Sequence, residues 1–408
     1  MGEKTLNVLC IASYYKGTDF MKACKEAGAN VFLLTSKKLE NKDWPRESLS
    51  DIFYMEENDH GVWDMKYAII GLGYVLREVQ LDLIVSLDDF DVEKGALLRE
   101  EFRIPGMGQT TARYFRDKLA MRMRAQEFGI PVPAFTPVFN NKALNEYLNS
   151  VPGPWMLKPR GEASATGIKK LYHADDVWKS IIEHGDDRYK YLIEQFKPGD
   201  VYHVDGLSNN GELIFCKSSR YLNTPMEVAH GGGIFRSVTL DDSSADAKAL
   251  KKLNALVMKA FGMQYSASHS EFIKCHEDGK FYFLETSARV GGAHLSDMVT
   301  VATGINLWKE WAKLEIAKGL GVEYKLPKSK NDNAGIIISL ARELTPDTSA
   351  FNDKEIEWRL NLDYHVGFIV KSDNKARIIE LLDDYAHRIK QDLHASAPPK
   401  RGKSNNEN

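Results

Sequence analysis

Residues 269–292, HSEFIKCHEDGKFYFLETSARVGG, have the composition of two β-strands joined by a tight turn. Strand interiors favour β-branched and aromatic residues and are poor in glutamate. One arm nevertheless carries Glu271 in its middle, and the other reaches Glu285 near its end. These acids are either ordinary charges on a solvent-facing strand surface, which are common, or a pair of functional carboxylates.

The length of the turn decides where the two acids lie. A three-residue loop at 277–279, with its glycine in the left-handed position, is a common hairpin connection. Counting outward from this loop sets Glu271 directly opposite Glu285, about 5 Å apart at Cβ. A two-residue Asp-Gly turn would instead place them on opposite faces. The neighbours expected on the shared face are Phe281, Phe283, Ile273 and Cys275.

Two carboxylates on a largely apolar face repel each other, and their desolvation is costly. A bound divalent cation is the simplest way to offset both the repulsion and the desolvation. The hairpin therefore indicates a candidate metal site.

Length and composition are those of a soluble globular protein of several domains. The chain has 408 residues, of which 43% are apolar and 27% charged, and this length suggests two to four domains. The formal net charge of −3 gives no broad attraction to nucleic acid or to anionic membranes. We expect neither as a partner.

The cysteines and apolar runs indicate a cytoplasmic protein. Cys10, Cys24, Cys216 and Cys275 show no CxxC spacing, so we expect reduced thiols. Residues 6–12 are too few for a signal-peptide core, and no stretch approaches the ~20 apolar residues of a membrane span.

The first hundred residues alternate strands and helices, as in a doubly wound α/β domain. We expect strands at 6–12, 30–35 and 82–89, with helices at 19–27 and 62–79. Ligands in such a domain bind at the carboxyl ends of the strands, and residues 82–89, DLIVSLDD, end in acids. The pattern GxGxxG is absent, which disfavours a dinucleotide dehydrogenase.

The remainder mixes hairpins and helices. A strand ending at Lys158 and Pro159 precedes a run of mostly small residues, 161–167, and a second short strand. Small residues let backbone N–H groups approach phosphate oxygens while the lysine offsets phosphate charge, although a plain loop is the more frequent explanation. Further expected segments are a helix at 113–128, a hairpin around 209–211, a glycine loop at 230–233, a helix at 245–262, a helical segment at 295–318 and an α+β tail at 334–393.

Four stretches in order carry a family resemblance. They are RDKLAMR with Lys118, MLKPRGEASATG with Lys158, EQFKPGD at 194–200, and the hairpin that closes on ETSARVGG. In order and spacing they resemble the ATP-grasp superfamily, from about residue 112 to about residue 304. The resemblance implies an ATP-grasp fold of the α/β and α+β classes. The implied division is an N-terminal doubly wound α/β domain (1–111), a lid subdomain (112–200), a large catalytic subdomain (201–330), a small C-terminal α+β unit (331–395) and a disordered tail (396–408).

The resemblance implies the nucleotide contacts. Lys118 and Lys158 would contact the phosphates of ATP, with residues 161–167 as a mobile lid. Glu194 and the backbone of Phe196 would hold adenine. Asp200 would bind the ribose; on the residues alone, a turn with a solvent-facing acid is the alternative.

The resemblance also implies the metal and the reacting centre. Glu271 and Glu285 match the acids that bind Mg²⁺, for which Mn²⁺ can substitute, and Mg²⁺ commonly binds through one or two carboxylates plus substrate phosphates. Arg289 matches the catalytic arginine of the family's ExNxR pattern and, with Lys158, would act on the transferred phosphoryl group. The family's metal-binding asparagine is Ser287 here, so a weaker or water-mediated ligand replaces an amide oxygen.

The implied activity is that of a ligase. A carboxylate attacks the γ-phosphate of ATP, and an amine then displaces phosphate from the acyl phosphate. The implied partners are thus a small-molecule carboxylate and an amine such as an amino acid, and dimers are frequent in the family. Candidate substrate residues are His230, Gly232, Arg236 and His269, although a histidine beside a glycine loop is more often structural.

Within the superfamily, the length and the segments GGGIFRS and HVGFIV are most similar to L-amino acid ligases. Biotin carboxylase has a similar hairpin but a longer glycine-rich lid, and carboxylating or formylating relatives stay open.

Two other classes compete with an enzyme. A non-catalytic ATP-binding module would fit Ser287, but both lysines, both acids and Arg289 are retained. A structural α/β interaction protein would have these acids as mere surface charge.

Overall fold

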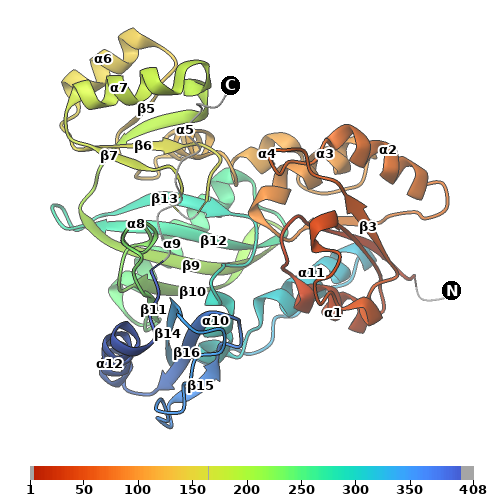
Figure 1. Cartoon of the computed structure of the whole chain (residues 1–408). Coiled ribbons are helices and arrows are strands. Elements are labelled where there is room, and N and C mark those ends of the chain that lie inside the picture. The colour runs from red at the N-terminus through yellow and green to blue at the C-terminus, as the bar shows by residue number, and fades with distance from the viewer. Residues whose placement is uncertain (1–3, 164, 397–408) are drawn as a thin grey trace.

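The computed structural model describes residues 4–163 and 165–396. Its chain passes through three β-sheets in turn, with helices on their faces (Figure 1). The expected disordered tail lies outside the described residues from 397 onward.

The N-terminal part is a four-stranded parallel sheet of order β3-β2-β1-β4, as the alternating pattern predicts. Helices α1 and α2 connect β1 to β2 and β3 to β4, whereas β2 reaches β3 through a segment with two short 3₁₀ turns; parallel neighbours need such long crossover connections. Its elements are β1 (Asn7–Ala12), α1 (Thr18–Glu26), β2 (Asn30–Ser36), β3 (Asp51–Met55), α2 (Met65–Val75), β4 (Leu83–Ser86) and α3 (Val92–Glu101), with short 3₁₀ turns at Lys37–Leu39, Arg46–Ser48 and Asp89–Asp91.

Two helices lead from this domain to a small antiparallel sheet of order β5-β8-β6-β7. The expected strands on either side of the small-residue run are β6 and β7. The elements are α4 (Gln109–Arg113), α5 (Lys118–Glu127), β5 (Phe135–Pro137), α6 (Asn141–Ser150), β6 (Trp155–Pro159), β7 (Lys169–Leu171), α7 (Ala174–His184), a 3₁₀ turn (Gly185–Lys190) and β8 (Tyr191–Gln195).

The third sheet has eight strands in the order β13-β12-β9-β10-β11-β14-β16-β15. The strands expected for the C-terminal unit continue this sheet through the β11–β14 pairing. The domain boundaries at 111, 200 and 330 stay predictions. The elements are β9 (Gly199–Asn209), β10 (Glu212–Tyr221), α8 (Pro225–Gly231), β11 (Phe235–Thr239), α9 (Ala245–Phe261), β12 (Ser266–Cys275), β13 (Phe281–Ser287), α10 (Leu295–Thr303), α11 (Leu307–Leu320), β14 (Asn333–Leu340), β15 (Ile356–Arg359), β16 (His365–Ser372) and α12 (Lys375–Asp392).

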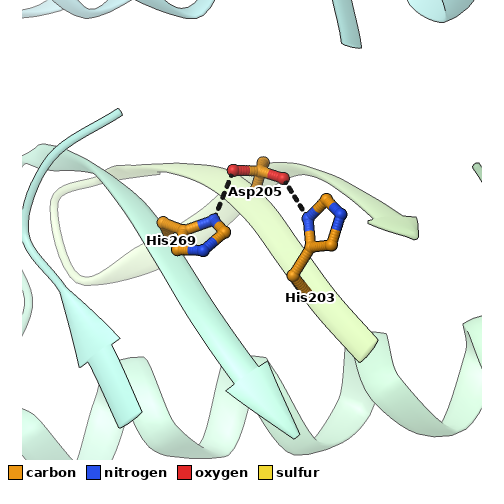
Figure 2. A group of neighbouring side chains, drawn as sticks. All are labelled: His203, Asp205 and His269. Atoms are coloured by element: carbon orange, nitrogen blue, oxygen red, sulfur yellow. Dashed lines mark hydrogen bonds and ion pairs between the residues drawn. The ribbon is translucent and has the colours of Figure 1, made fainter. Parts of the chain in front are cut away.

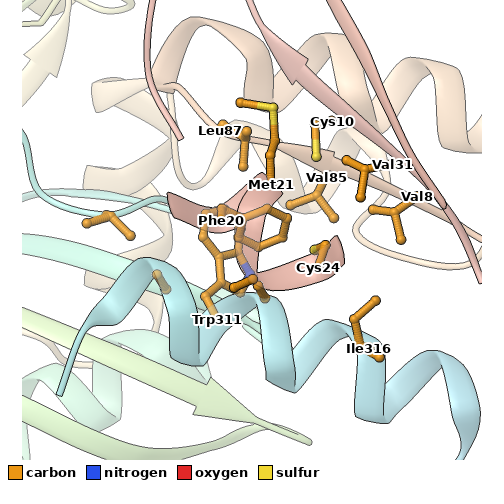
Figure 3. Packing of buried hydrophobic residues seen from close by; sticks show 14 of the residues in the cluster. Val8, Cys10, Phe20, Met21, Cys24, Val31, Val85, Leu87, Trp311 and Ile316 are labelled. Carbon is orange, nitrogen blue, oxygen red and sulfur yellow. The ribbon is translucent and has the colours of Figure 1, made fainter. Parts of the chain in front are cut away.

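A buried apolar cluster fixes the N-terminal domain against the large sheet. Phe20 of α1 meets Trp311 of α11 edge-on, with ring centroids 4.9 Å apart. Figure 3 shows these rings between the strands of the N-terminal sheet and α11. Both side chains are almost fully buried, and burial of such aromatic rings dominates core energetics. This packing sets the carboxyl ends of β1 and β4 beside the large sheet.

Two sequence expectations need correction. The helical segment at 295–318 is two helices, α10 and α11, separated at Gly304, whose φ of +75° ends the first one. The glycine loop at 230–233 begins inside α8. That helix starts with a capping box, in which the Thr224 side chain accepts from the Glu227 N–H, and it has a proline in its first turn.

Candidate functional site

A cavity of about 770 Å³ lies between the small sheet and the large sheet. It is larger than most sites for small cofactors need and falls within the range of ligand pockets. Nine of the predicted site residues line it: Lys118, Lys158, Glu194, Phe196, His269, Glu271, Glu285, Ser287 and Arg289. They come from α5, β6, β8, β12, β13 and the segments that follow β8 and β13.

Glu271 and Glu285 are cross-strand partners, as the hairpin count predicts. The turn, however, has four residues, 276–279, because the Cys275 N–H donates to the Lys280 carbonyl at 2.9 Å. A bulge between Glu271 and Phe272 offsets the extra turn residue and restores the pairing of the acids.

The bulge changes the neighbours of the two acids. Phe281 and Phe283 were expected on their face, but Phe283 packs against Phe272 and Phe261 in the opposite core. The acids instead share the cavity with Ile273 and Leu284. The apolar face beside the acids is thus real but built from aliphatic residues.

Lys118 and Glu285 form the most direct contact across the cavity. Their Nζ and Oε2 atoms lie 2.8 Å apart, and the lysine side chain is 9% exposed. Lys118 also donates to the Glu162 carbonyl in the small-residue segment. It begins α5, whose N-cap Asp117 accepts from two backbone N–H groups. Because the cap fixes the helix start, it also fixes the direction of the ammonium.

Glu194 lies between two cations. Its carboxylate accepts from Arg122 Nε at 2.9 Å and pairs with Lys158. Burial opposes ionisation, but Arg122 and Lys158 hold the pKa of Glu194 below its ordinary value. Both carboxylate oxygens of Glu194 already have a cationic partner. The residue thus positions Lys158 before it could contact a ligand.

The segment at Phe196 also has contacts within the protein already. Its backbone N–H, expected to serve adenine, donates to the Pro154 carbonyl at 2.9 Å. Lys170 lies 3.4 Å above its ring, within the range of a cation–π contact. The carbonyl of Phe196 is the backbone group that can still accept from a ligand.

Arg289 is held by an acid from the N-terminal domain. Its Nη2 lies 3.2 Å from Asp89 Oδ2, across 200 positions of sequence. Burial opposes ionisation of Asp89, but Arg289, Arg116 and Lys118 keep its pKa below the ordinary value. Within the described residues, Asp89 Oδ1 and Arg289 Nε are buried with no hydrogen-bond partner. Both residues line the cavity, so a bound ligand has polar groups to satisfy there.

Asp89 and Arg122 contact the predicted site residues Arg289 and Glu194, and sequence reasoning missed both. Asp89 lies in the acidic end of the predicted strand at 82–89, where ligands of doubly wound sheets bind. Arg122 follows Lys118 by four positions, so the two share one face of α5. Both signals were present in the sequence.

A second cluster lies beside the acids, on β9 and β12. Figure 2 shows Asp205 between His203 and His269. His203 Nδ1 lies 2.7 Å from Asp205 Oδ2, and His269 Nδ1 lies 2.8 Å from Asp205 Oδ1. The outer nitrogen of His203 is 2.8 Å from Ser237 Oγ.

These three side chains could hold a metal, since their ligand atoms lie within 4.8 Å of one another. Each imidazole, however, meets a separate carboxylate oxygen at hydrogen-bond distance, so protons already satisfy the group. Burial opposes protonation of His269, but Asp205 raises its pKa to about 9. The two imidazoles hold the pKa of Asp205 well below its usual range despite burial.

The positively charged ring of His269 faces Glu271. The His269 Nε2 lies 3.8 Å from Glu271 Oε1, and the Tyr221 hydroxyl donates to the same oxygen at 2.9 Å. Burial opposes ionisation of Glu271, but His269 and Tyr221 keep its pKa below the ordinary value. The Glu271 carboxylate is therefore ionised near neutral pH.

Gly291 leaves room for the cluster. A Cβ atom at this position would lie 2.5 Å from Asp205 Oδ1 and 3.0 Å from His269 Nδ1. No other residue fits without moving one of the two side chains.

Asp200, Gly232 and Arg236 are not among the described residues that line the cavity. Asp200 lies within 4 Å of Arg220 and His276 instead. Arg236 pairs with Asp383 at 2.5 Å and donates to Asn223. Gly232 ends α8 with a φ of +59°. His230 lies within α8, and the position of its side chain is outside the described part of the chain.

The donor set fits a hard divalent cation. Glu271, Glu285 and Ser287 offer oxygens to one cavity, as Mg²⁺ prefers. The ammonium of Lys118 pairs with Glu285 in this structure. Positive charge therefore already lies beside the carboxylates that would hold the cation.

None of the described helices is both long enough and apolar enough to cross a membrane.

The cavity lies between a small antiparallel sheet and a larger sheet and is lined by both lysines and acids, as the ATP-grasp resemblance implies. The chain has the ATP-grasp fold expected from its sequence, and its relatives include ligases of this class. It is 26% identical over 248 residues to the L-arginine-specific L-amino acid ligase of Bacillus subtilis, covering 59% of each chain. The match thus spans less than two thirds of that relative. No family model matches.

Solved structures with this fold align over nearly the whole chain. The L-amino acid ligase from Bacillus licheniformis aligns with a TM-score of 0.74 at 15% identity, covering 97% of this chain and 99% of that one. The biotin carboxylase domain of the Hydrogenobacter thermophilus 2-oxoglutarate carboxylase, solved with MgADP and bicarbonate, gives a TM-score of 0.70 at 15% identity, covering 93% and 89%.

Proposed function

We propose that the protein is an ATP-dependent carboxylate–amine ligase, and specifically an L-amino acid ligase. It would join its substrates through an acyl phosphate and release ADP and phosphate. The observation that carries this proposal is the convergence of Lys118, Lys158, Glu285 and Arg289 on one cavity from four separate stretches of chain.

The residues divide the work by position. Lys158 and Lys118 would neutralise the phosphates of ATP, with the segment 161–167 covering them. Phosphoryl transfer depends on positioning and charge neutralisation and needs no protein nucleophile. Arg289, held by Asp89, would stabilise the charge of the transferred phosphoryl group and of the acyl phosphate.

Glu271, Glu285 and Ser287 would hold Mg²⁺, or Mn²⁺ in its place. The cation would supply charge neutralisation to the phosphates. Tyr221 and the His269–Asp205 pair keep Glu271 ionised and oriented for that role.

The carboxylate and amine substrates would enter beside Arg289 and His269. Asp200 as the ribose ligand and Arg236 as a substrate contact have less support, because both have other partners, while His230 and Gly232 stay proposals. We retain Arg289, Lys158 and His269 as the residues on which the chemistry depends most.

The test is a pairwise screen of amino acids and small acids with Mg·ATP. Phosphate and ADP release are followed, and the product is identified by mass spectrometry. A dipeptide or amide product with equal amounts of ADP and phosphate is expected.

Three controls separate the alternatives. Turnover with bicarbonate alone, giving a carboxylated product, would instead establish a carboxylase. ATP binding with no phosphate release under any substrate would leave a non-catalytic nucleotide-binding module. Failure of Mg·ATP to raise the melting temperature would refute ATP binding altogether.

A further inference from the structure

The helix α2 is apolar on every side. Of its eleven residues, MKYAIIGLGYV, Lys66 alone is charged, yet Ala68 and Leu72 are the only fully buried side chains. A helix that is apolar all round is ordinarily covered on all sides. In a single copy of the chain, the outer face of α2 has no such cover.

The uncovered side chains form a stripe. Tyr67, Ile70 and Tyr74 are 64%, 47% and 59% exposed, and Val62, just before the helix, is 53% exposed. The spacing of three and four residues sets the first three on one face. Together the four expose on the order of a few hundred Å² of surface, the size at which a patch marks a contact site. Figure 1 shows α2 at the edge of the molecule.

A hollow lies beside this stripe. Its volume is about 470 Å³, and it is lined mainly by apolar side chains of β3 and α2, with Tyr67 and Gly71 on the helix side and Phe53 and Tyr54 on the strand side. Side chains around an unfilled space lose dispersion contacts. The patch therefore combines protruding aromatic rings with room to receive one.

The charges at the two ends of α2 are arranged for a second copy in reverse direction. Asp64 and Lys66 stand at its start, and Arg77 and Glu78 stand just after its end. Arg77 lies 4.1 Å over the ring of Tyr74 of its own helix, so its charge stands at the edge of the stripe. Antiparallel helices bring Asp64 near Arg77 of the second copy and Lys66 near its Glu78, whereas parallel helices would oppose like charges.

We propose that α2 is the contact surface of a symmetric homodimer, in which the two α2 helices cross antiparallel with Ile70 close to the two-fold axis. Such an interface must be self-complementary, since the same patch serves both copies. In this arrangement Tyr67 meets Tyr74 of the second copy beside the hollow. The proposal is independent of the reaction, because α2 contributes no residue to the described cavity between the sheets.

The first test is the mass of the full-length chain in solution. Light scattering and sedimentation at increasing protein concentration are expected to give twice the 46.1 kDa chain mass. Ile70→Glu opposes two carboxylates across the axis and should weaken association by a hundredfold or more. The matched control is Ile182→Glu on α7, where the side chain is 74% exposed and association should not change. Melting temperature with and without Mg·ATP verifies that each variant is folded.

The second test places Ile70 at the two-fold axis. Ile70→Cys should form a disulfide between two copies on mild oxidation, because residues at the axis approach each other, while Ile182→Cys should not. Cys10, Cys24 and Cys275 are buried and Cys216 is partly buried, and the Ile182→Cys variant, which carries the same four thiols, shows whether they contribute.

Three results would overturn the proposal. They are a wild-type chain that stays monomeric at every concentration, a dimer unaffected by Ile70→Glu, and a monomer whose α2 variants change only the binding of a small apolar probe. The last result would assign the hollow to a small ligand.

Discussion

Replacing Arg122 by methionine should destabilise the protein in a pH-dependent way. Arg122 is fully buried, and it bonds Glu194 through Nε and the Leu284 carbonyl through Nη1. Methionine fills a similar volume but leaves the Glu194 carboxylate, 2% exposed, with Lys158 as its single cation. Removing one partner of a buried charge costs about 3–5 kcal/mol. Because Lys158 remains, we expect a loss of about 3 kcal/mol at pH 7.

The sign of the pH dependence follows from Glu194. Its pKa is lowered in the folded wild-type protein, so its contribution is present above the unfolded value of about 4.3 and is lost as pH falls through the lower folded value. In Arg122→Met the buried carboxyl group gains a raised pKa. Protonation then removes the unpaired charge, and the deficit relative to wild type should shrink toward about 1 kcal/mol below pH 4.5, the share of the lost backbone bond.

The assay is urea unfolding followed by tryptophan fluorescence at pH 7 and pH 4.5. Arg124→Met is the matched control, because Arg124 lies on the same helix in a partly exposed pair with Glu127. It should cost less than about 1 kcal/mol. Glu194→Gln in the Arg122→Met background should recover most of the loss. A deficit below 1 kcal/mol at pH 7, or an equal deficit at both pH values, would refute the reasoning.

Three further predictions address the site. Glu285→Ala should abolish turnover while the protein still unfolds in one cooperative transition, at a melting temperature lowered by the loss of the Lys118 pair, as differential scanning fluorimetry can verify; near-normal turnover would contradict the proposed metal site. Asp89→Asn should lower kcat by about 10- to 100-fold with little change in KM for ATP, since a buried charge-assisted bond of about 1.5–3 kcal/mol holds Arg289; steady-state kinetics decides this, and a change in KM alone would contradict it. Gly291→Ala should destabilise by about 1–3 kcal/mol through collision with Asp205 and His269, and an unchanged urea midpoint would show that the cluster can move aside.

The hairpin shows how far local reasoning reaches. The predicted pairing of Glu271 with Glu285 is found, but the predicted three-residue turn was wrong: a bulge at Leu284 offsets the fourth turn residue. The face of Phe283 could not be predicted, because the bulge turns it toward Phe261 of α9, which lies outside the hairpin sequence.

Contacts between distant residues were beyond the sequence. Asp89 and Arg289 meet because the Phe20–Trp311 core holds two domains together, and no local pattern links them. The acidic strand end and the shared helix face of Lys118 and Arg122 were the available signals. The prediction of a loop at 230–233 was partly wrong. It followed the glycine content and overlooked the capping box at Thr224–Glu227, which starts α8.

The eight-stranded sheet limits how the protein can be recombined with its relatives. The β11–β14 pairing runs from Phe235 opposite Ile338 to Val238 opposite Gly335, so everything after residue 330 is tied to the sheet that carries the acids. An exchanged C-terminal segment must match this register residue by residue, since a slip of one turns every side chain to the other face. A chimera that takes β11 and β14 from the same parent keeps the hydrogen bonds between these strands. One that is joined at residue 330, and so takes β14 without its own β11, leaves an open sheet edge.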